Sequence, residues 1–216
     1  MLVRYWMTTP PITVSGEMTL EDAFDLMHRH GIRRLPVMSG DLVRGIVAMS
    51  DLYPYIGPQK TGKAALPEAL KVELRKVRVS DVMTTPSVTC DRNAPIEDVG
   101  ALMRKRKIGA VPVVHKEELV GIITESDILA ALSEVAQMGA DCTRICFRIP
   151  LAEKINIFYR IVSLCEQKGI EILTLLTHPL GDESHLVMVR VRGEKTSELM
   201  SELWNNHYEV LALTPK

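Results

Sequence analysis

Met7-Thr8-Thr9-Pro10 recurs as Met83-Thr84-Thr85-Pro86, 76 residues further along the chain. The same offset continues without a gap across residues 7–52 and 83–128, where 16 of 46 positions are identical. Many of the differences exchange one apolar residue for another. An ungapped match of this length indicates duplication, so the first part of the chain is expected to be one structural unit written twice.

Each copy predicts the same order of short strands and helices. A strand over Pro-Ile-Thr-Val precedes a helix whose apolar residues recur at helical spacing, at Leu20, Ala23, Phe24 and Met27. A strand at 35–37, a turn at 39–41 and an apolar strand at 45–47 follow. A second helix is expected from Asp51 in the first copy and from Asp127 in the second. Strands that alternate with helices indicate a mixed α/β unit.

These residues resemble a known family. Met-Thr-x-x-Pro, a later Leu/Val-Pro-Val and the closing Gly121-Ile122-Ile123-Thr124-Glu125-Ser126-Asp127 are similar to the motifs of CBS domains arranged as a tandem pair. The resemblance implies a compact pair whose clefts bind adenosine-containing ligands such as AMP, ADP, ATP or S-adenosylmethionine. We expect repeat one over 1–60, a linker with a bridging helix over 61–79, and repeat two over 80–138.

The strand-to-helix junction at Thr124 and Asp127, which also holds Ser126, is the leading candidate for ligand binding. A hydroxyl and a carboxylate three residues apart can face one cleft, and a carboxylate can accept hydrogen bonds from both hydroxyls of a ribose. Thr-x-x-Asp is also a helix capping box that needs no ligand, and spacing alone leaves both interpretations open. The first copy keeps Asp51 but has Ala48 in place of the hydroxyl. We therefore expect unequal clefts, with the Asp127 cleft the stronger.

The family resemblance implies that each cleft combines residues from both copies. The Asp127 cleft would be lined by Met7, Ile12, Gly31 and Ile32. The Asp51 cleft would be lined by Met83, Val88, Lys107 and Ile108. Aliphatic residues can sandwich a flat base, although isolated apolar residues are core positions by default. We place Arg33 and Arg34 beside the Asp127 cleft, where their guanidinium groups can bind phosphate groups.

The pattern changes after residue 140 and predicts the order β-α-β-β-α-β. Strand-like runs cover 144–149, 170–177, 185–192 and 208–213, and two apolar helical faces separate them. This order predicts a ferredoxin-like sandwich over 142–216 with its helices on one face. It resembles an ACT domain, and a CBS pair followed by an ACT domain resembles the acetoin-utilisation-type CBS proteins. An ACT ligand loop usually has a glycine after the first strand. Pro150-Leu151-Ala152 here leaves sheet-to-sheet pairing as the alternative role.

Composition and motifs argue against several function classes. The 26 basic and 27 acidic residues produce no field for nucleic-acid binding. No apolar run approaches the about 20 residues that span a bilayer, and four cysteines show no disulfide spacing. The Gly57–Ala64 segment approaches a P-loop but has Ala64 where a hydroxyl would hold Mg²⁺. We expect a cytoplasmic protein with no catalytic residues, metal site or catalytic cofactor, and with no nucleic-acid or membrane partner.

Three function hypotheses follow from these residues. The leading one is a non-catalytic allosteric sensor, a homodimer with an adenine nucleotide or S-adenosylmethionine as its regulatory ligand and a regulated protein as a further partner. A constitutive dimerisation or assembly scaffold with vestigial clefts is the alternative, which Ala48 favours. A small-molecule enzyme built on the near-P-loop is the least favoured.

Overall fold

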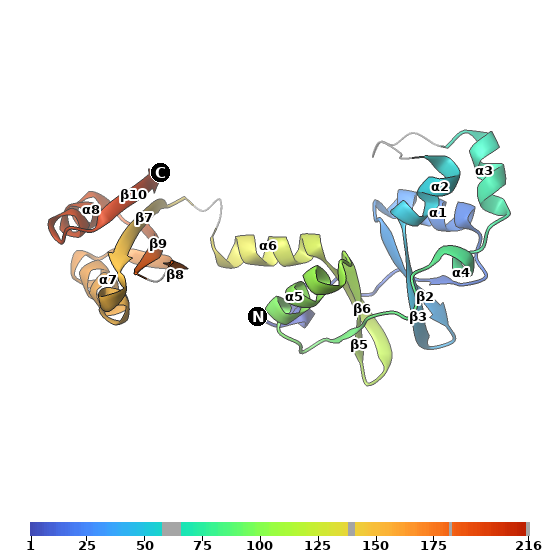
Figure 1. Ribbon diagram of the computed structural model, residues 1–216, viewed down its shortest axis with the longest axis horizontal. Coiled ribbons are helices and arrows are strands. Elements are labelled where there is room, and N and C mark those ends of the chain that lie inside the picture. The colour runs from blue at the N-terminus through green and yellow to red at the C-terminus, as the bar shows by residue number, and fades with distance from the viewer. Residues whose placement is uncertain (58–65, 138–140, 182, 215–216) are drawn as a thin grey trace. The chain divides into compact units, whose positions relative to one another are not determined.

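The computed structural model describes residues 1–57, 66–137, 141–181 and 183–214. The chain divides into two compact units, Met1–Ala131 and Leu132–Lys216, whose helices and strands are labelled in Figure 1. No helix within the described residues is long and apolar enough to cross a membrane. All of the near-P-loop segment after Gly57 lies outside the described residues.

The first unit contains two three-stranded sheets of the same construction. In each sheet a short strand pairs in parallel with the middle strand, which pairs antiparallel with the third. The first sheet and its helices are β1 (Val14–Ser15), α1 (Leu20–His30), β2 (Arg34–Ser39), β3 (Leu42–Ala48), the 3-10 turn η2 (Met49–Leu52) and α2 (Tyr53–Ile56). The second set is β4 (Cys90–Asp91), α5 (Ile96–Arg106), β5 (Ala110–His115), β6 (Glu118–Thr124) and α6 (Glu125–Val135). The expected order of elements is confirmed in both copies.

The second helix of each copy begins two residues earlier than expected, at Met49 and Glu125. The aspartate lies in the first turn, where its carboxylate accepts a backbone N–H from the residue before that turn. Asp51 Oδ2 accepts the N–H of Ala48 at 2.7 Å, and Asp127 Oδ2 accepts the N–H of Thr124 at 2.8 Å. Each aspartate therefore lies inside the first turn of its helix and stabilises the start of that helix from there.

The segment before the first copy packs on the second copy, which the sequence did not predict. Residues 2–8 include the 3-10 turn η1 (Val3–Tyr5). The Val3 N–H donates to the Ala94 carbonyl at 3.0 Å, and Thr8 forms an antiparallel bridge with Ile122. The first residues of the chain therefore pack as part of the second copy.

The segment before the second copy makes the matching contacts with the first copy. It contains the short helix α4 (Val79–Val82). The Val79 N–H donates to the Met18 carbonyl at 2.9 Å, and Thr84 bridges Ile46. Val79 is fully buried, as is its counterpart Val3. The duplication therefore extends upstream of the Met-Thr-Thr-Pro motifs, into residues whose side chains mostly differ.

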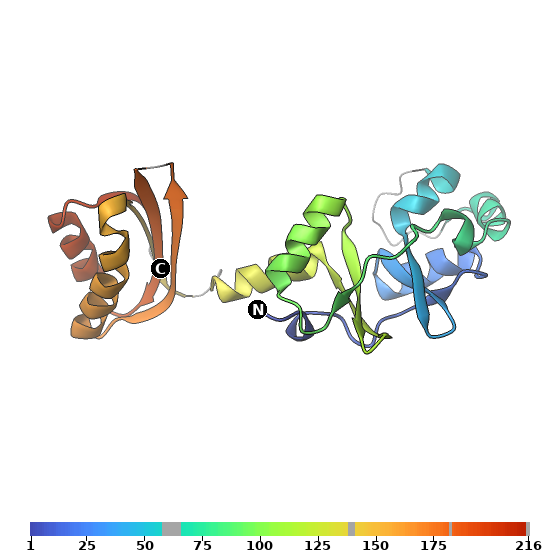
Figure 2. The same cartoon turned by 60° about the horizontal axis from the view of Figure 1, so that its bottom comes forward.

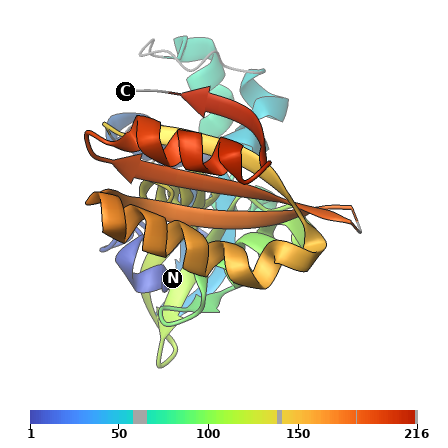
Figure 3. The same cartoon turned by 90° about the vertical axis from the view of Figure 1, so that its left-hand side faces the viewer.

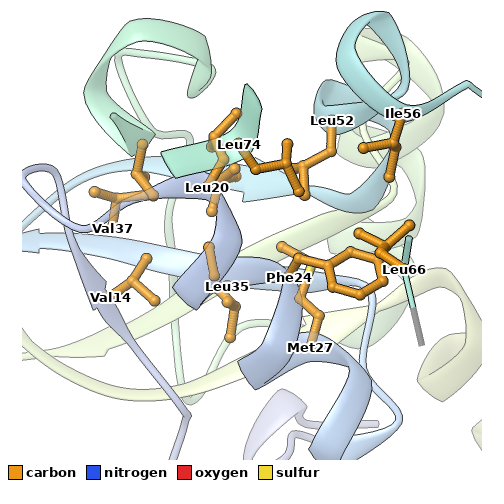
Figure 4. Close-up of a cluster of buried hydrophobic side chains, with 13 residues drawn as sticks. Val14, Leu20, Phe24, Met27, Leu35, Val37, Leu52, Ile56, Leu66 and Leu74 are labelled. Atoms are coloured by element: carbon orange, nitrogen blue, oxygen red, sulfur yellow. The ribbon is translucent and has the colours of Figure 1, made fainter. Parts of the chain in front are cut away.

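The first copy folds around a cluster of buried apolar side chains (Figure 4). Leu20, Phe24 and Met27 of α1 pack with Leu35 of β2, as their helical spacing predicted. Leu74 of α3 (Glu68–Arg75) joins the cluster and is fully buried. α3 lies within the segment for which a bridging helix was expected. The second copy has its own cluster of buried residues, made by Val3, Ile96, Val99, Met103, Val111, Val113, Ile123 and Ala131.

The second unit has the predicted β-α-β-β-α-β order of elements. These are β7 (Thr143–Pro150), the 3-10 turn η3 (Leu151–Glu153), α7 (Lys154–Lys168), β8 (Glu171–Leu180), β9 (Ser184–Arg192), α8 (Thr196–Asn205) and β10 (Glu209–Thr214). The strands form one antiparallel sheet in the order β10-β7-β9-β8. α7 and α8 lie together on one face of this sheet, in orange and red in Figures 2 and 3. Alternate residues of β7 and β9 fill the core beneath them, namely Ile145, Phe147, Ile149, Val187, Val189 and Val191.

Two glycines allow the crossing segments to approach the sheets. A Cβ at Gly45 of β3 would lie 2.6 Å from the Thr84 carbonyl oxygen and 3.0 Å from Met83 Sδ. A Cβ at Gly121 of β6 would lie 2.7 Å from Met7 Sδ and 2.9 Å from the Thr8 carbonyl oxygen. Real Cβ atoms do not come so close to backbone, so any side chain at these positions would push the crossing segment away.

Replacing either glycine should therefore destabilise the first unit. We expect Gly45→Ala and Gly121→Ala each to lower the free energy of unfolding by about 1–3 kcal/mol, because overpacking displaces the adjacent strand. Gly100→Ala is the matched control, since its Cβ would make only ordinary 3.6 Å contacts with the Ile128 side chain of α6 and alanine favours a helix. Chemical denaturation of the three variants measures the differences. Equal stability of all three would contradict the close approach of the crossing segments to the two glycines.

Candidate functional site

A cavity of about 290 Å³ lies where the first copy's strand-to-helix junction meets residues of the second copy. The first copy supplies residues at the ends of β2 and β3 and in η2. The segment after Met83 and the start of β5 supply the rest. The lining residues are Arg34, Ile46, Ala48, Ser50, Asp51, Thr84, Pro86, Ser87, Val88, Lys107, Ile108, Gly109 and Ala110. We refer to this as the Asp51 cavity.

Asp51 is held at the cavity by the backbone of its own junction. Its Oδ2 accepts the Ala48 N–H at 2.7 Å, and the residue is partly buried. Ala48 carries no hydroxyl, so no side chain at that position can donate to the carboxylate. The Ser87 hydroxyl, which also belongs to the lining, is buried without a hydrogen-bond partner among the described residues. The cavity therefore offers a fixed carboxylate and an unused hydroxyl.

Two cations line the same cavity and come from different copies. Arg34 opens β2, opposite Ala48 in the antiparallel pair. Lys107 ends α5 in the left-handed conformation, with φ of 56°, which is uncommon for a residue with a side chain. A Cβ at Gly109 would lie 2.2 Å from a terminal nitrogen of the Arg34 guanidinium. The guanidinium thus lies close to second-copy backbone at Gly109, and a side chain there would make it shift.

Thr124 and Asp127 are bonded to each other. The Thr124 hydroxyl donates to Asp127 Oδ2 at 2.8 Å, the Thr124 N–H donates to the same oxygen at 2.8 Å, and the Asp127 N–H donates to Thr124 Oγ1 at 3.3 Å. This is the capping box that the spacing allowed as the alternative to a ligand site. Ser126, in the same turn, is exposed. The sequence favoured this junction over the Asp51 cleft, whereas the geometry of the described cavity favours Asp51.

Apart from Thr124, Ser126 and Asp127, the predicted site residues divide into three groups. Four line the Asp51 cavity: Asp51, Val88, Lys107 and Ile108. Arg34 lines it too, although we placed it beside the Asp127 slot, because it opens the strand that pairs with Ala48. The remaining predicted residues are not part of the lining of the Asp51 cavity. They pack against other residues, end a helix or are exposed, and they are Met7, Ile12, Gly31, Ile32, Arg33 and Met83.

The structure shows what each of these six residues contacts or where it lies in its element. Met7 and Met83 cover the glycines of the opposite copy. Gly31 ends α1 with φ of 63°. Ile12 and Ile32 pack against the first copy's core, and Arg33 is exposed with its carbonyl accepting the Met49 N–H at 2.8 Å.

Sequence reasoning missed part of the lining. Thr84 and Pro86 belong to the repeated Met-Thr-Thr-Pro motif, so the repeat that revealed the fold also contained this signal. Ile46 and Ser50 lie in the Gly45–Asp51 segment, in which only Ala48 and Asp51 drew attention. Ser87 and Gly109 carried no comparable signal, because their positions depend on how the two copies meet.

The described residues do not form a metal site or contain a strongly activated thiol at Cys90 or Cys165. They contain no group of three His, Cys, Asp or Glu side chains that could hold a metal ion. Burial, and then the charge of Asp91, raise the pKa of Cys90 to about 11, and burial raises the pKa of Cys165 above its usual value. These thiols therefore remain protonated at neutral pH and are poor nucleophiles.

Comparisons with known proteins agree with this architecture. The CBS domain family model matches residues 3–57 and 79–134. A CBS domain-containing protein of Dictyostelium discoideum is 32% identical over 141 residues, which cover 63% of this chain and 94% of that protein. A Vibrio cholerae protein assigned to acetoin utilization (AcuB) is 29% identical in its crystal structure, with a TM-score of 0.52, covering 64% of this chain and 94% of that one.

A second solved structure is relevant to the cavity. The CBS domain pair of protein MJ0100, in complex with 5′-methylthioadenosine and S-adenosyl-L-methionine, is 25% identical with a TM-score of 0.50. The match covers 62% of this chain and 97% of that one. With its repeated motifs, its two like sheets and the family match over both copies, the chain belongs to the CBS domain family and carries a tandem CBS pair.

Proposed function

We propose that the protein is a non-catalytic regulatory sensor that binds an adenosine-containing ligand in the Asp51 cavity. The observation that carries this proposal is the meeting of one carboxylate, Asp51, and two cations, Arg34 and Lys107, around a single cavity. Aliphatic Val88 and Ile108 belong to the same lining. A carboxylate, an apolar slot and a cationic end match the ribose, base and phosphate parts of a nucleotide.

Each part of the ligand has a partner in this proposal. Asp51 accepts hydrogen bonds from the ribose hydroxyls through the oxygen that the Ala48 N–H leaves free. The adenine lies against Val88 and Ile108. Arg34 and Lys107 bind the phosphates, which favours AMP, ADP or ATP over S-adenosylmethionine, because the sulfonium of the latter is itself cationic.

A solved relative supports the adenosine class. The MJ0100 CBS pair binds 5′-methylthioadenosine and S-adenosyl-L-methionine and is 25% identical to this chain. Both of its ligands contain adenosine but lack phosphate, so the base and ribose are the shared elements. In this chain the two cations of the lining are the additional feature that selects for a phosphorylated ligand.

Regulation follows from the origin of the lining residues. Asp51 comes from the first copy, and Lys107 and Ile108 come from the second. A ligand that contacts all three is bound most tightly in the arrangement that brings them together, so it shifts the equilibrium between arrangements of the pair. The Asp127 junction is a weaker second site in this proposal, because Oδ2 of its carboxylate already accepts both the N–H and the hydroxyl of Thr124, whereas Oδ2 of Asp51 accepts only the Ala48 N–H.

The second unit extends the proposal as an ACT-like domain. Its β10-β7-β9-β8 sheet leaves β8 and β10 as edge strands, whose unpaired backbone groups suit pairing with a second copy. In the proposed state the protein is a cytoplasmic homodimer that reports its ligand to a regulated protein partner. An assembly scaffold with empty clefts is the second candidate, favoured by the closed capping box at Thr124 and Asp127.

Calorimetric titration with AMP, ADP, ATP and S-adenosylmethionine tests the proposal. We expect one adenine nucleotide to bind, and Asp51→Asn to weaken it about tenfold or more, since a hydrogen bond to a charged group contributes about 1.5–3 kcal/mol. Asparagine keeps an acceptor for the Ala48 N–H, so the fold should be unaffected. Asp127→Asn is the matched control and should leave the tighter site unchanged. If no ligand binds to folded wild-type protein, the scaffold candidate is the correct one.

Arg34 should determine the preference for phosphorylated ligands. We expect Arg34→Gln to lower the affinity for ADP about tenfold while leaving the affinity for adenosine nearly unchanged, because only ADP carries the charge that the guanidinium binds. Arg33→Gln removes the same charge from the neighbouring exposed residue and serves as the control. A parallel loss for adenosine and ADP would show that Arg34 shapes the cavity without contacting phosphate.

A further inference from the structure

A second concavity of the first unit carries positive charge and has no assigned role. It has a volume of about 740 Å³, and its lining includes Arg4, Tyr5 and Arg92 together with the apolar residues Pro10, Leu119 and Val120, which we call its apolar floor. It shares no residue with the Asp51 cavity and contains neither Thr124 nor Asp127. Of the residues expected to line the Asp127 cleft it contains only Met7, so it lies apart from both aspartates.

Backbone contact brings the two arginines together. The Arg4 N–H donates to the Arg92 carbonyl at 2.9 Å, so their side chains leave adjacent stretches of chain and enter the same concavity. No carboxylate belongs to its lining as the structure describes it. The neighbouring Asp91 is engaged elsewhere, with His115 at 3.5 Å and with the Asn93 N–H at 2.8 Å. Two like charges therefore share one hollow without an opposite charge in its lining.

The hydrogen bonds of the Arg4 guanidinium orient it without neutralising its charge. Arg4 donates to Asn93 Oδ1 and to the Tyr5 hydroxyl, each at 2.9 Å, and lies 4.9 Å from the centre of the Tyr5 ring. Arg92 Nε is buried and has no hydrogen-bond partner among the described residues. A buried donor on a charged group without a partner is costly, and no protein group offsets that cost at Arg92 Nε within the described residues.

The first copy supplies an internal comparison, because it has the same backbone arrangement without the arginines. There the Ser80 N–H donates to the Gly16 carbonyl at 2.9 Å, at the positions equivalent to Arg4 and Arg92. Asp81 takes the place of Tyr5, and its carboxylate accepts the Arg78 N–H at 2.9 Å. The fold thus forms with serine and glycine at these positions. Because the crossing segment does not require the cationic pair, its presence points to a role beyond folding.

We infer that Arg4, Tyr5 and Arg92 form an oxyanion-binding site for a small organic phosphate or carboxylate. The two guanidinium groups bind the oxyanion, for which planar, fork-shaped donors are well suited. The exposed Tyr5 ring and the apolar floor of Pro10, Leu119 and Val120 accommodate a flat or aliphatic remainder of the ligand. The site goes beyond the proposed nucleotide sensing, since it would give the CBS pair a second effector of different chemistry.

Phenyl phosphate and benzoate are suitable probes, because each joins one oxyanion to one flat apolar ring. Their binding to the full-length protein is followed by NMR through the Nε–Hε resonances of its arginines. We expect a saturable shift of the Arg92 resonance, with the tighter of the two probes showing which oxyanion the site prefers. Arg92→Gln and Arg4→Ser should each weaken that probe about tenfold. Arg4→Ser installs the residue that the first copy carries at this place, so it should preserve the fold.

Two control variants establish whether the probes bind specifically at this concavity. Arg104→Gln removes one exposed charge from α5 and should change the dissociation constant by less than about twofold, because distant surface charges are screened. Asp51→Asn should leave probe binding intact, which keeps the result independent of the proposed nucleotide site. A shift that does not saturate, or that survives both Arg92→Gln and Arg4→Ser, would overturn the inference. So would its loss in folded Asp51→Asn protein.

Discussion

The first unit depends on the reciprocal crossing of two short segments. The segment with Met7 and Thr8 lies on Gly121 and Ile122 of the second copy, and the segment with Met83 and Thr84 lies on the first copy. Neither copy completes its own sheet surface or its own core, since Val3 is buried in the second copy's cluster. The tandem pair is therefore held together by the same contacts that build each half, and separating the copies would unfold parts of both.

This crossing also explains why a cleft forms where it does. Thr84 bridges Ile46 and brings the following residues, including Pro86 and Val88, beside the junction that holds Asp51. The backbone frame is repeated in both copies, whereas the side chains placed on it are not. Arg34 and Lys107 face the Asp51 cavity, and their counterparts in the other repeat are Ala110 and Gly31. Duplication has supplied two equivalent positions, and substitution has given them different chemistry.

The sequence predicted those features that follow from local periodicity and repetition. The duplicated order of elements, the buried face of α1 and the β-α-β-β-α-β order of the second unit are confirmed. The crossing of the leading segments was not predictable, because it is a contact between residues far apart in the chain. For the same reason the sequence placed Arg34 beside the Asp127 cleft, whereas in the structure it lines the Asp51 cavity. Its position depends on the cross-strand partner Ala48 and on the space left by Gly109.

The structure changes the interpretation of Ala48, the residue that replaces a threonine in the first copy. In the sequence, loss of the hydroxyl at this position favoured a degraded cleft. In the structure, the corresponding Thr124 donates its hydroxyl to Asp127 Oδ2 at 2.8 Å, so a ligand that approaches this oxygen competes with a charge-assisted hydrogen bond, and only Oδ1 takes part in no bond with Thr124. Asp51 meets no such competition from residue 48, because Ala48 contributes only a backbone N–H, which almost any residue can supply. The residue that looked like a defect therefore leaves the Asp51 carboxylate more available to a ribose than its counterpart.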